Sequence, residues 1–308
     1  MAKQKLVLAI DPFVETKANL RKALATVTSI AAQLNASVTA ATVISPDRLR
    51  WPVDFEPSWK SRFEFVGEKE IAKALKEPRF QAFQKKIIFQ PSNSSSQSMA
   101  ALVGFADEAR ASSIVVLTHE HIKPRFHLAG SFTSRLIHES NVPVLAIDVR
   151  AKSVSRIRRI VLATSFSKSE KKQLATAIEW AKKVDADLIL LNVIIGLPPN
   201  FLDGEFLAGG AERLRMFVDD QTKTANADAK SWSAVAKRAG VRAGYHIVSA
   251  TESPAEVIVK FARQNRADLI MMSSSTGPRT AMFLGSVCRD VLKKAKRNVL
   301  ILKQEKLK

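Results

Sequence analysis

The chain has 308 residues, of which 46% are hydrophobic and 25% charged, a composition typical of globular domains rather than of disordered chains. No apolar run reaches the roughly 18 residues of a membrane span, and the only cysteine, Cys288, leaves no intrachain disulfide to form. The formal net charge of +19 favours anionic partners such as nucleic acids, phosphates or acidic lipids. The first residues, MAKQKLVLAIDPF, have too short an apolar stretch for a secretory signal, so we expect a cytoplasmic protein without a membrane partner.

Short runs rich in Val, Ile and Leu alternate with stretches of helical periodicity along the whole chain. Such runs, bounded by polar residues, predict strands that are buried on both faces. Leu20, Leu24, Val27 and Ala31 recur at three- and four-residue steps, which predicts a helix with one apolar stripe over 19–34. A second helix is predicted over 173–184, and the predicted strands cover 6–10, 37–44, 86–89, 113–117 and 143–147, then 159–163, 187–194, 244–248, 268–272 and 298–302.

The two halves of the chain repeat one another. Residues 113–147 align with 268–302 at a shift of 155, which places Gly130-Ser131 on Gly285-Ser286, and KLVLA at 5–9 matches RIVLA at 159–163 at a shift of 154. A period of half the chain predicts two copies of one domain, over 1–150 and 155–308. Strands that alternate with helices predict an α/β fold in each copy, a Rossmann-like sandwich with a five-stranded parallel sheet and four helices.

In an open parallel sheet, ligands bind beyond the carboxyl ends of the strands, where the strand order changes direction. The first strand of each copy ends at Asp11 or Ser165, and the loops 118–131 and 273–286 lead from the fourth strand into the last helix. Each loop ends in Gly-Ser, which suits an anion because the first N–H groups of a helix point outward and glycine permits close approach.

Both halves resemble universal stress protein domains, and the chain resembles a tandem member of that family. The similarity rests on VLAIDP and VLATSFS at the first strand, on the loop after the fourth strand, and on LAGS or LGSV opening the last helix; it covers 1–150 and 155–303. Members that bind ATP carry G-x2-G-x9-G-[ST] in that loop, with an Asp at the end of the first strand beside adenine and ribose. The resemblance therefore implies ATP or another adenine nucleotide as ligand. The residues implied are Asp11, Gly130 and Ser131 in the first copy and Ser165, Ser273, Ser274, Ser275, Thr276, Gly277, Gly285 and Ser286 in the second.

Both copies depart from the family's glycine pattern, and each keeps a different part of the site. The first two glycines are absent, and the spacing to Gly130 or Gly285 is one residue short. The first copy keeps Asp11 but has Glu120, a carboxylate that would repel phosphate. The second lacks the acid but has a loop of hydroxyl side chains, so the second copy is favoured for the nucleotide.

The resemblance implies a stress-response binding protein that is read by partners and at most hydrolyses ATP weakly, and no hydrolase or kinase motif stands out. It also implies that the copies form a pseudo-twofold pair through the apolar edges 142–147 and 299–302, which need cover. The apolar stretches 45–59 and 196–210 are too long for simple loops; they either pack on the domain partner, pack on a second chain in a homodimer, or form a lid over the site.

Two alternatives to nucleotide binding remain at this stage. Residues 1–155 hold 21 Lys and Arg against 14 Asp and Glu, and the rest hold 27 against 15, so a basic nucleic-acid or acidic-ligand binder is one alternative. A metal-binding regulatory protein is the other, because His119 and His121 lie two residues apart and Glu120 or His127 would complete a zinc site. Cys288 lies near the start of the last helix, where its thiol is either activated or buried and inert.

Overall fold

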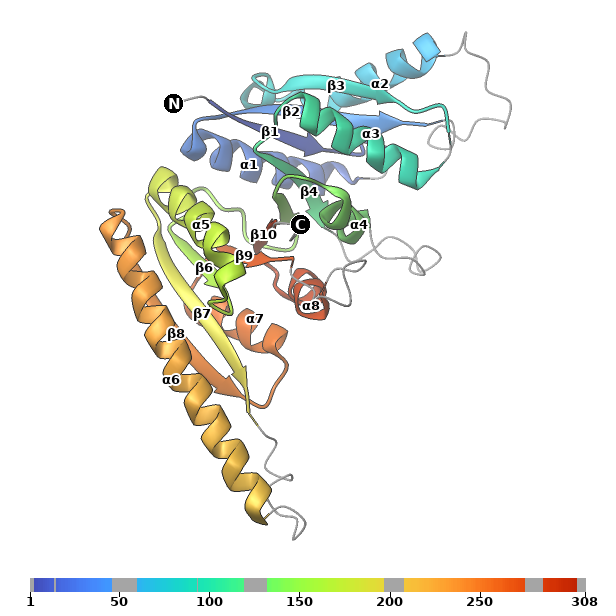
Figure 1. Cartoon of the computed structure of the whole chain (residues 1–308). Helices are drawn as coiled ribbons and strands as arrows, with labels where there is room; N and C mark the ends of the chain where they lie inside the picture. The colour runs from blue at the N-terminus through green and yellow to red at the C-terminus, as the bar shows by residue number, and fades with distance from the viewer. Residues whose placement is uncertain are drawn as a thin grey trace. The chain divides into compact units, whose positions relative to one another are not determined.

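The structure is a computed structural model that describes residues 3–13, 15–45, 60–92, 94–118, 132–196, 208–274 and 285–303. The chain divides into two compact units, Met1–Arg156 and Ile157–Lys308 (Figure 1). Each unit contains five parallel strands and four α-helices among the described residues, as the sequence predicts. Among these helices, none combines the length and the apolar character that crossing a membrane requires.

The first unit has the strand order β3-β2-β1-β4-β5. Leu6 of β1 lies opposite Val38 of β2 on one side and Ser113 of β4 on the other, so β1 is the central strand and β4 its neighbour. The elements are β1 (Gln4–Ala9), α1 (Lys17–Leu34), β2 (Ala36–Ile44), α2 (Lys60–Ala74), a 3-10 turn (Pro78–Phe80), β3 (Gln84–Phe89), α3 (Ser95–Glu108), β4 (Ser113–Thr118), α4 (Phe132–Glu139) and β5 (Val144–Asp148).

The second unit repeats this arrangement with the strand order β10-β9-β6-β7-β8. Ile160 of β6 lies opposite Leu188 of β7 and Leu269 of β9, so β6 is the central strand and β9 its neighbour. The elements are β6 (Arg159–Ala163), a 3-10 turn η5 (Lys168–Glu170), α5 (Lys171–Val184), β7 (Asp187–Ile195), α6 (Ala208–Arg238), β8 (Ala243–Ala250), α7 (Pro254–Gln264), β9 (Leu269–Ser273), α8 (Ser286–Lys294) and β10 (Asn298–Leu302).

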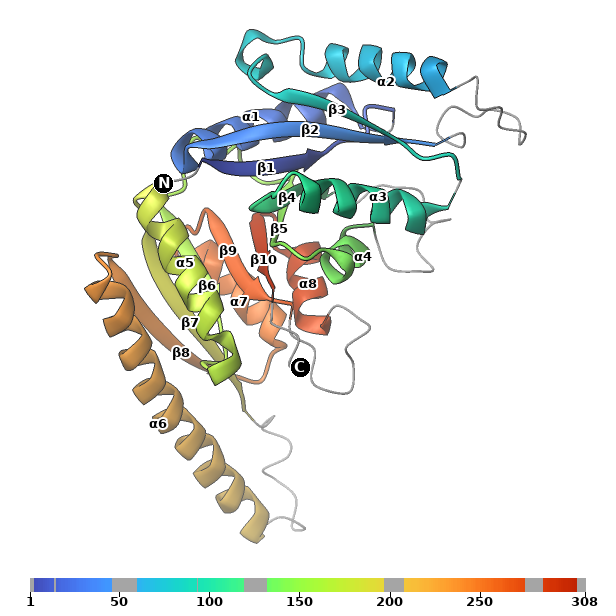
Figure 2. The ribbon, with the colours of Figure 1, turned by 45° about the horizontal axis from the view of Figure 1, so that its top comes forward.

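Helices cover both faces of each sheet (Figure 2). In the first unit α1 and α2 pack together, and α3 packs with α4. In the second unit α7 packs with α8, while α6 lies along β7 and β8. In each unit the chain returns from the outer strand to a strand beside the central one. The helices before this return cover one face of the sheet and those after it cover the other, which is the doubly wound arrangement.

The repeat extends to single backbone conformations. Asn35 and Asp185 end α1 and α5 with positive φ angles of 50° and 53°. Arg110 and Arg266 follow α3 and α7 with a φ of 52° each. Left-handed residues of this kind terminate helices because their N–H groups satisfy the last free carbonyls. The two copies therefore end the same helices by the same device.

The strand predictions are confirmed to within one or two residues at each end, and the α1 stripe of Leu20, Leu24, Val27 and Ala31 is buried. The prediction that every strand is buried on both faces is wrong for the outer strands β3 and β8. The first three residues of β3 are exposed, and exposed and partly buried residues alternate along much of β8. The outermost strand of each sheet has a neighbour on one side within its own unit, so one of its faces and one of its edges meet solvent more readily.

Candidate functional site

The carboxyl ends of β6 and β9 form the switch point of the second sheet, because the chain leaves these neighbouring strands toward opposite sides. Thr164 and Ser165 directly follow β6, and Ser273 is the last residue of β9. Two of the predicted site residues, Ser165 and Ser273, therefore lie at this edge. The structure brings both of them onto a residue that the sequence analysis did not single out, Glu170.

The carboxylate of Glu170 accepts four hydrogen bonds at this edge. Its Oε2 accepts from the Oγ1 of Thr164 at 2.9 Å and from the backbone N and Oγ of Ser165, both at 2.8 Å. Its Oε1 accepts from the Oγ of Ser273 at 3.0 Å. Glu170 is only 6% exposed. The four donors therefore replace the hydrogen bonds to water that the carboxylate loses when it is buried. The acid thus ties the ends of the two central strands together.

The conformation of the turn between β6 and α5 brings this side chain back to the end of β6. Glu170 ends η5 and is the N-cap of α5, but its side chain makes no capping hydrogen bond and turns back to β6. Phe166 has a positive φ of 59°, which is strained for a bulky residue. Its N–H donates to the Oγ1 of Thr164 at 3.0 Å, and its ring meets Trp232 of α6 edge-on at 5.3 Å. Pro12 occupies the matching place in the first unit, where the fixed φ of proline forbids this turn.

The N-terminus of α8 is the second part of the site. Gly285 is the N-cap of α8 and has no side chain with which to cap it. The first N–H groups of α8 lack partners within the helix, and the helix dipole makes this end positive. The N–H of Ser274 donates to the carbonyl of Leu302 at 3.2 Å, so that donor is already engaged. Ser275, Thr276 and Gly277 of the predicted site lie outside the described residues.

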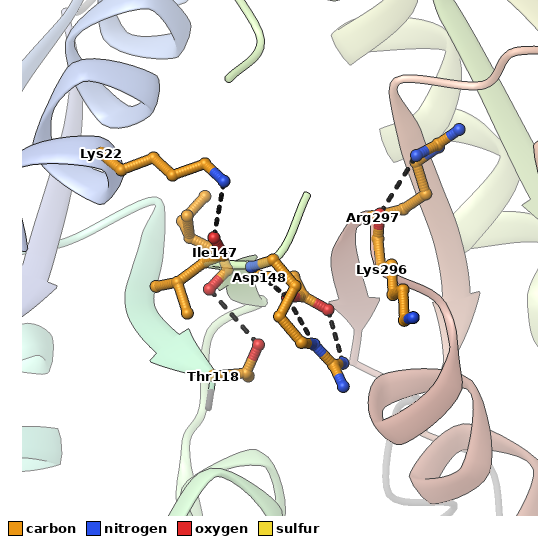
Figure 3. Close-up of polar contacts among 8 residues, drawn as sticks. Lys22, Thr118, Ile147, Asp148, Lys296 and Arg297 are labelled. Atoms are coloured by element: carbon orange, nitrogen blue, oxygen red, sulfur yellow. Dashed lines mark hydrogen bonds and ion pairs between the residues drawn. The ribbon is translucent and has the colours of Figure 1, made fainter. Parts of the chain in front are cut away.

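The first unit places Asp11 and Thr118 at the corresponding edge, after β1 and at the end of β4. The Oδ1 of Asp11 accepts from the N–H of Phe13 at 3.2 Å. The Oγ1 of Thr118 donates to the carbonyl of Ile147 at 3.3 Å, as Figure 3 shows. Lys22 of α1 donates to the carbonyl of Val149 at 2.7 Å. Gly130, Ser131, His119 and His121 lie outside the described residues, so the glycine motif and the metal site of this copy stay predictions.

The described residues offer no group of three or more His, Cys, Asp and Glu side chains suited to a metal ion. Cys288 of α8 is 2% exposed, and burial raises the pKa of its thiol to about 12. Its position near a helix N-terminus therefore does not lower this pKa, and the prediction of a buried thiol is confirmed.

A shallow hollow of about 120 Å³ lies elsewhere, beside the amino ends of β7 and β8. Arg242 bonds there to Asp187 at 2.6 Å and to Asp185 at 3.2 Å, and these hydrogen bonds raise the pKa of the guanidinium. This is the opposite edge of the sheet from Glu170, so the hollow is not part of the candidate site. It is lined by Ala181, Lys182, Asp185, Ala186, Gly240, Val241 and Arg242.

A protein-family profile matches both copies of this repeated domain. The profile of the universal stress protein family matches residues 3–148 and again residues 156–303. The chain belongs to the universal stress protein family. A search of curated protein sequences found no match.

Several solved structures share the fold over nearly the whole chain. A universal stress protein from Archaeoglobus fulgidus DSM 4304 is 17% identical, with a TM-score of 0.68 over 99% of this chain and 97% of that one. A functionally unknown protein from Pseudomonas aeruginosa PAO1 is 14% identical, with a TM-score of 0.58 over 98% and 93%. A putative universal stress protein from Pseudomonas aeruginosa UCBPP-PA14 is 14% identical, with a TM-score of 0.56 over 98% and 94%. Likeness at this level of identity concerns the fold alone.

Proposed function

We propose that this universal stress protein is a regulatory binding protein whose second unit binds an adenine nucleotide at the carboxyl edge of β6 and β9. The phosphates sit against the N–H groups of Gly285 and Ser286, and the nucleoside lies toward the ends of the central strands. The protein acts by binding, with weak ATP hydrolysis at most.

The observation that carries the proposal is that α8 begins at the sheet edge that holds the switch point, with glycine as its N-cap. Uncapped N–H groups and a positive helix end favour an anion, and the missing Cβ lets a phosphate approach the backbone. The surplus of Lys and Arg, which gives the chain a net charge of +19, favours the approach of such an anion.

Calorimetry with ATP tests the proposal on the full chain. Gly285→Val should abolish or strongly weaken ATP binding, because the added side chain stands where the phosphates approach α8. Gly244→Val on β8 is the matched control, since a Cβ at Gly244 meets no atom within 4 Å. Equal ATP affinity in the parent and in Gly285→Val would place the site elsewhere, and a parent that binds no ATP at millimolar concentration would refute the proposal.

A further inference from the structure

Three hydroxyl groups at the switch point donate their protons to the same carboxylate. Thr164, Ser165 and Ser273 each donate to Glu170, at 2.9, 2.8 and 3.0 Å. A hydroxyl carries one proton, so a hydroxyl that donates inward keeps only lone pairs for a ligand. Thr164 uses its oxygen to accept from the N–H of Phe166, whereas Ser165 is exposed and Ser273 partly exposed. Ser165 and Ser273 therefore present their oxygens to a ligand as hydrogen-bond acceptors.

We propose that Glu170 sets the hydrogen-bond polarity of this edge, so that the second unit binds donor groups of a ligand there and turns phosphate away. The identity of the ligand rests on the proposed function. Within it, the donors are the sugar hydroxyls of the nucleoside, which bind Ser165 and Ser273, and the phosphates are left to the N-terminus of α8. Glu170 is thus a specificity-determining residue that orients the nucleotide.

Charge works in the same direction as the hydroxyl protons. Glu170 places a negative charge behind the two serines, and its 6% exposure means that little water screens it. A phosphate at Ser165 and Ser273 would meet this charge and would find no free hydroxyl proton. A sugar hydroxyl would instead donate to a serine oxygen whose own proton is already held by a carboxylate, which strengthens the acceptor.

In the second unit, the carboxylate of Glu170 takes the place of the acid that is missing at the end of the first strand. Ser165 stands where the first unit has Asp11, but the carboxylate of Glu170 reaches the backbone N of Ser165 from η5. The second unit therefore holds a carboxylate in the turn that follows the strand rather than at the end of the strand. A purely structural clasp would use the same contacts but would leave the choice between nucleoside and phosphate unaffected by its charge.

The test compares two probes, adenosine and inorganic tripolyphosphate, by calorimetry on the full chain. Glu170→Gln keeps the shape of the side chain, removes its charge and frees serine protons. We expect adenosine affinity to fall about tenfold and tripolyphosphate affinity to rise about tenfold. This is the size of change that the loss of a hydrogen bond to a charged group produces. Glu179→Gln is the matched control, because Glu179 is exposed on α5, where it pairs with Lys183; it should change neither affinity.

A folded Glu170→Gln protein that leaves both affinities within about twofold of the parent would overturn the inference and make Glu170 a structural clasp. A parent that binds neither ATP nor adenosine refutes the proposed function instead. In that case a gain of tripolyphosphate binding in Glu170→Gln still supports the polarity inference, and no gain overturns it.

Ser273→Ala keeps the test decisive if Glu170→Gln does not fold. This variant removes one acceptor oxygen and leaves the carboxylate in place. Adenosine binding should weaken, tripolyphosphate binding should stay unchanged, and Ser273→Thr should restore the parent's behaviour. Weaker tripolyphosphate binding in Ser273→Ala would mean that this hydroxyl donates to phosphate, which contradicts the inference.

Discussion

At the scale of single residues, Cys288 shows how burial outweighs a favourable helix position. A thiol near a helix N-terminus gains from the dipole when it ionises, but at 2% exposure the cost of burying a thiolate dominates and raises the pKa to about 12. A pKa this high favours the neutral thiol near pH 8, and burial hinders the access of reagents.

We predict that Cys288 stays unmodified by a thiol reagent such as dithionitrobenzoate at pH 8 in the folded protein and reacts fully in guanidinium chloride. The chain has one cysteine, so the absorbance of the released chromophore reports this residue alone. Reaction of the native protein within minutes would show that α8 opens readily or that the thiol is accessible.

The same scale shows what the sequence can predict of the site. Ser165, Ser273 and Gly285 follow from the rule that ligands meet the carboxyl edge at the switch point, and the structure places all three at the ends of β6 and β9 or at the start of α8. Glu170 could not be found in this way, because its backbone belongs to η5 and only the strained turn at Phe166 brings its side chain back. The available signal was an acid five residues after Ser165, in a turn that lacks the Pro12 of the first copy.

At the scale of elements, α6 packs on its sheet through a narrow stripe of small residues and one large residue, Trp232. Ala229, Trp232, Ser233 and Ala236 are buried at three- and four-residue steps, and Trp232 meets Phe166 at the site. Trp232 therefore links the helix to the turn that carries Glu170.

We predict that Trp232→Ala lowers the free energy of unfolding by about 3–5 kcal/mol, because it leaves a cavity between α6 and the turn. Urea unfolding followed by circular dichroism measures this. Val235→Ala is the control on the same helix: Val235 is 39% exposed, and the change should stay within about 0.5 kcal/mol. Similar effects of the two changes would mean that Trp232 does not anchor α6.

The sequence predicts the burial of the central strands correctly but not that of the outer strands. Continuous apolar runs such as 160–162 correctly predict strands that are buried on both faces, because helices cover both faces of such a strand. An outer strand such as β3 has the same local propensity but a different environment. Its place at the sheet edge depends on the strand order, which no run of residues encodes locally.

At the scale of the whole molecule, the repeat gives each unit a buried centre of its own. Leu6, Val7 and Leu8 are buried in β1, and Ile160, Val161 and Leu162 occupy the same places in β6. Each unit has about 150 residues, enough for an independent core. We therefore predict that fragments 1–156 and 157–308, expressed separately, each unfold cooperatively in a thermal scan followed by circular dichroism. A fragment without a cooperative transition would show that its core depends on the other half.

Mixing the two fragments tests the predicted pairing of the edges 142–147 and 299–302. Within its own unit, each of β5 and β10 has a strand neighbour on one side only, and an apolar edge of this kind gains from being covered. The fragments should therefore associate in sedimentation velocity. Val299→Asp in the second fragment should abolish association, because it places a charge in the edge strand β10, whereas Ile195→Asp at the exposed end of β7 should not. Val299 is itself buried, so this comparison is made on variants that keep the cooperative thermal transition of the parent fragment. Fragments that each fold and yet sediment separately would show that these edges are covered in some other way.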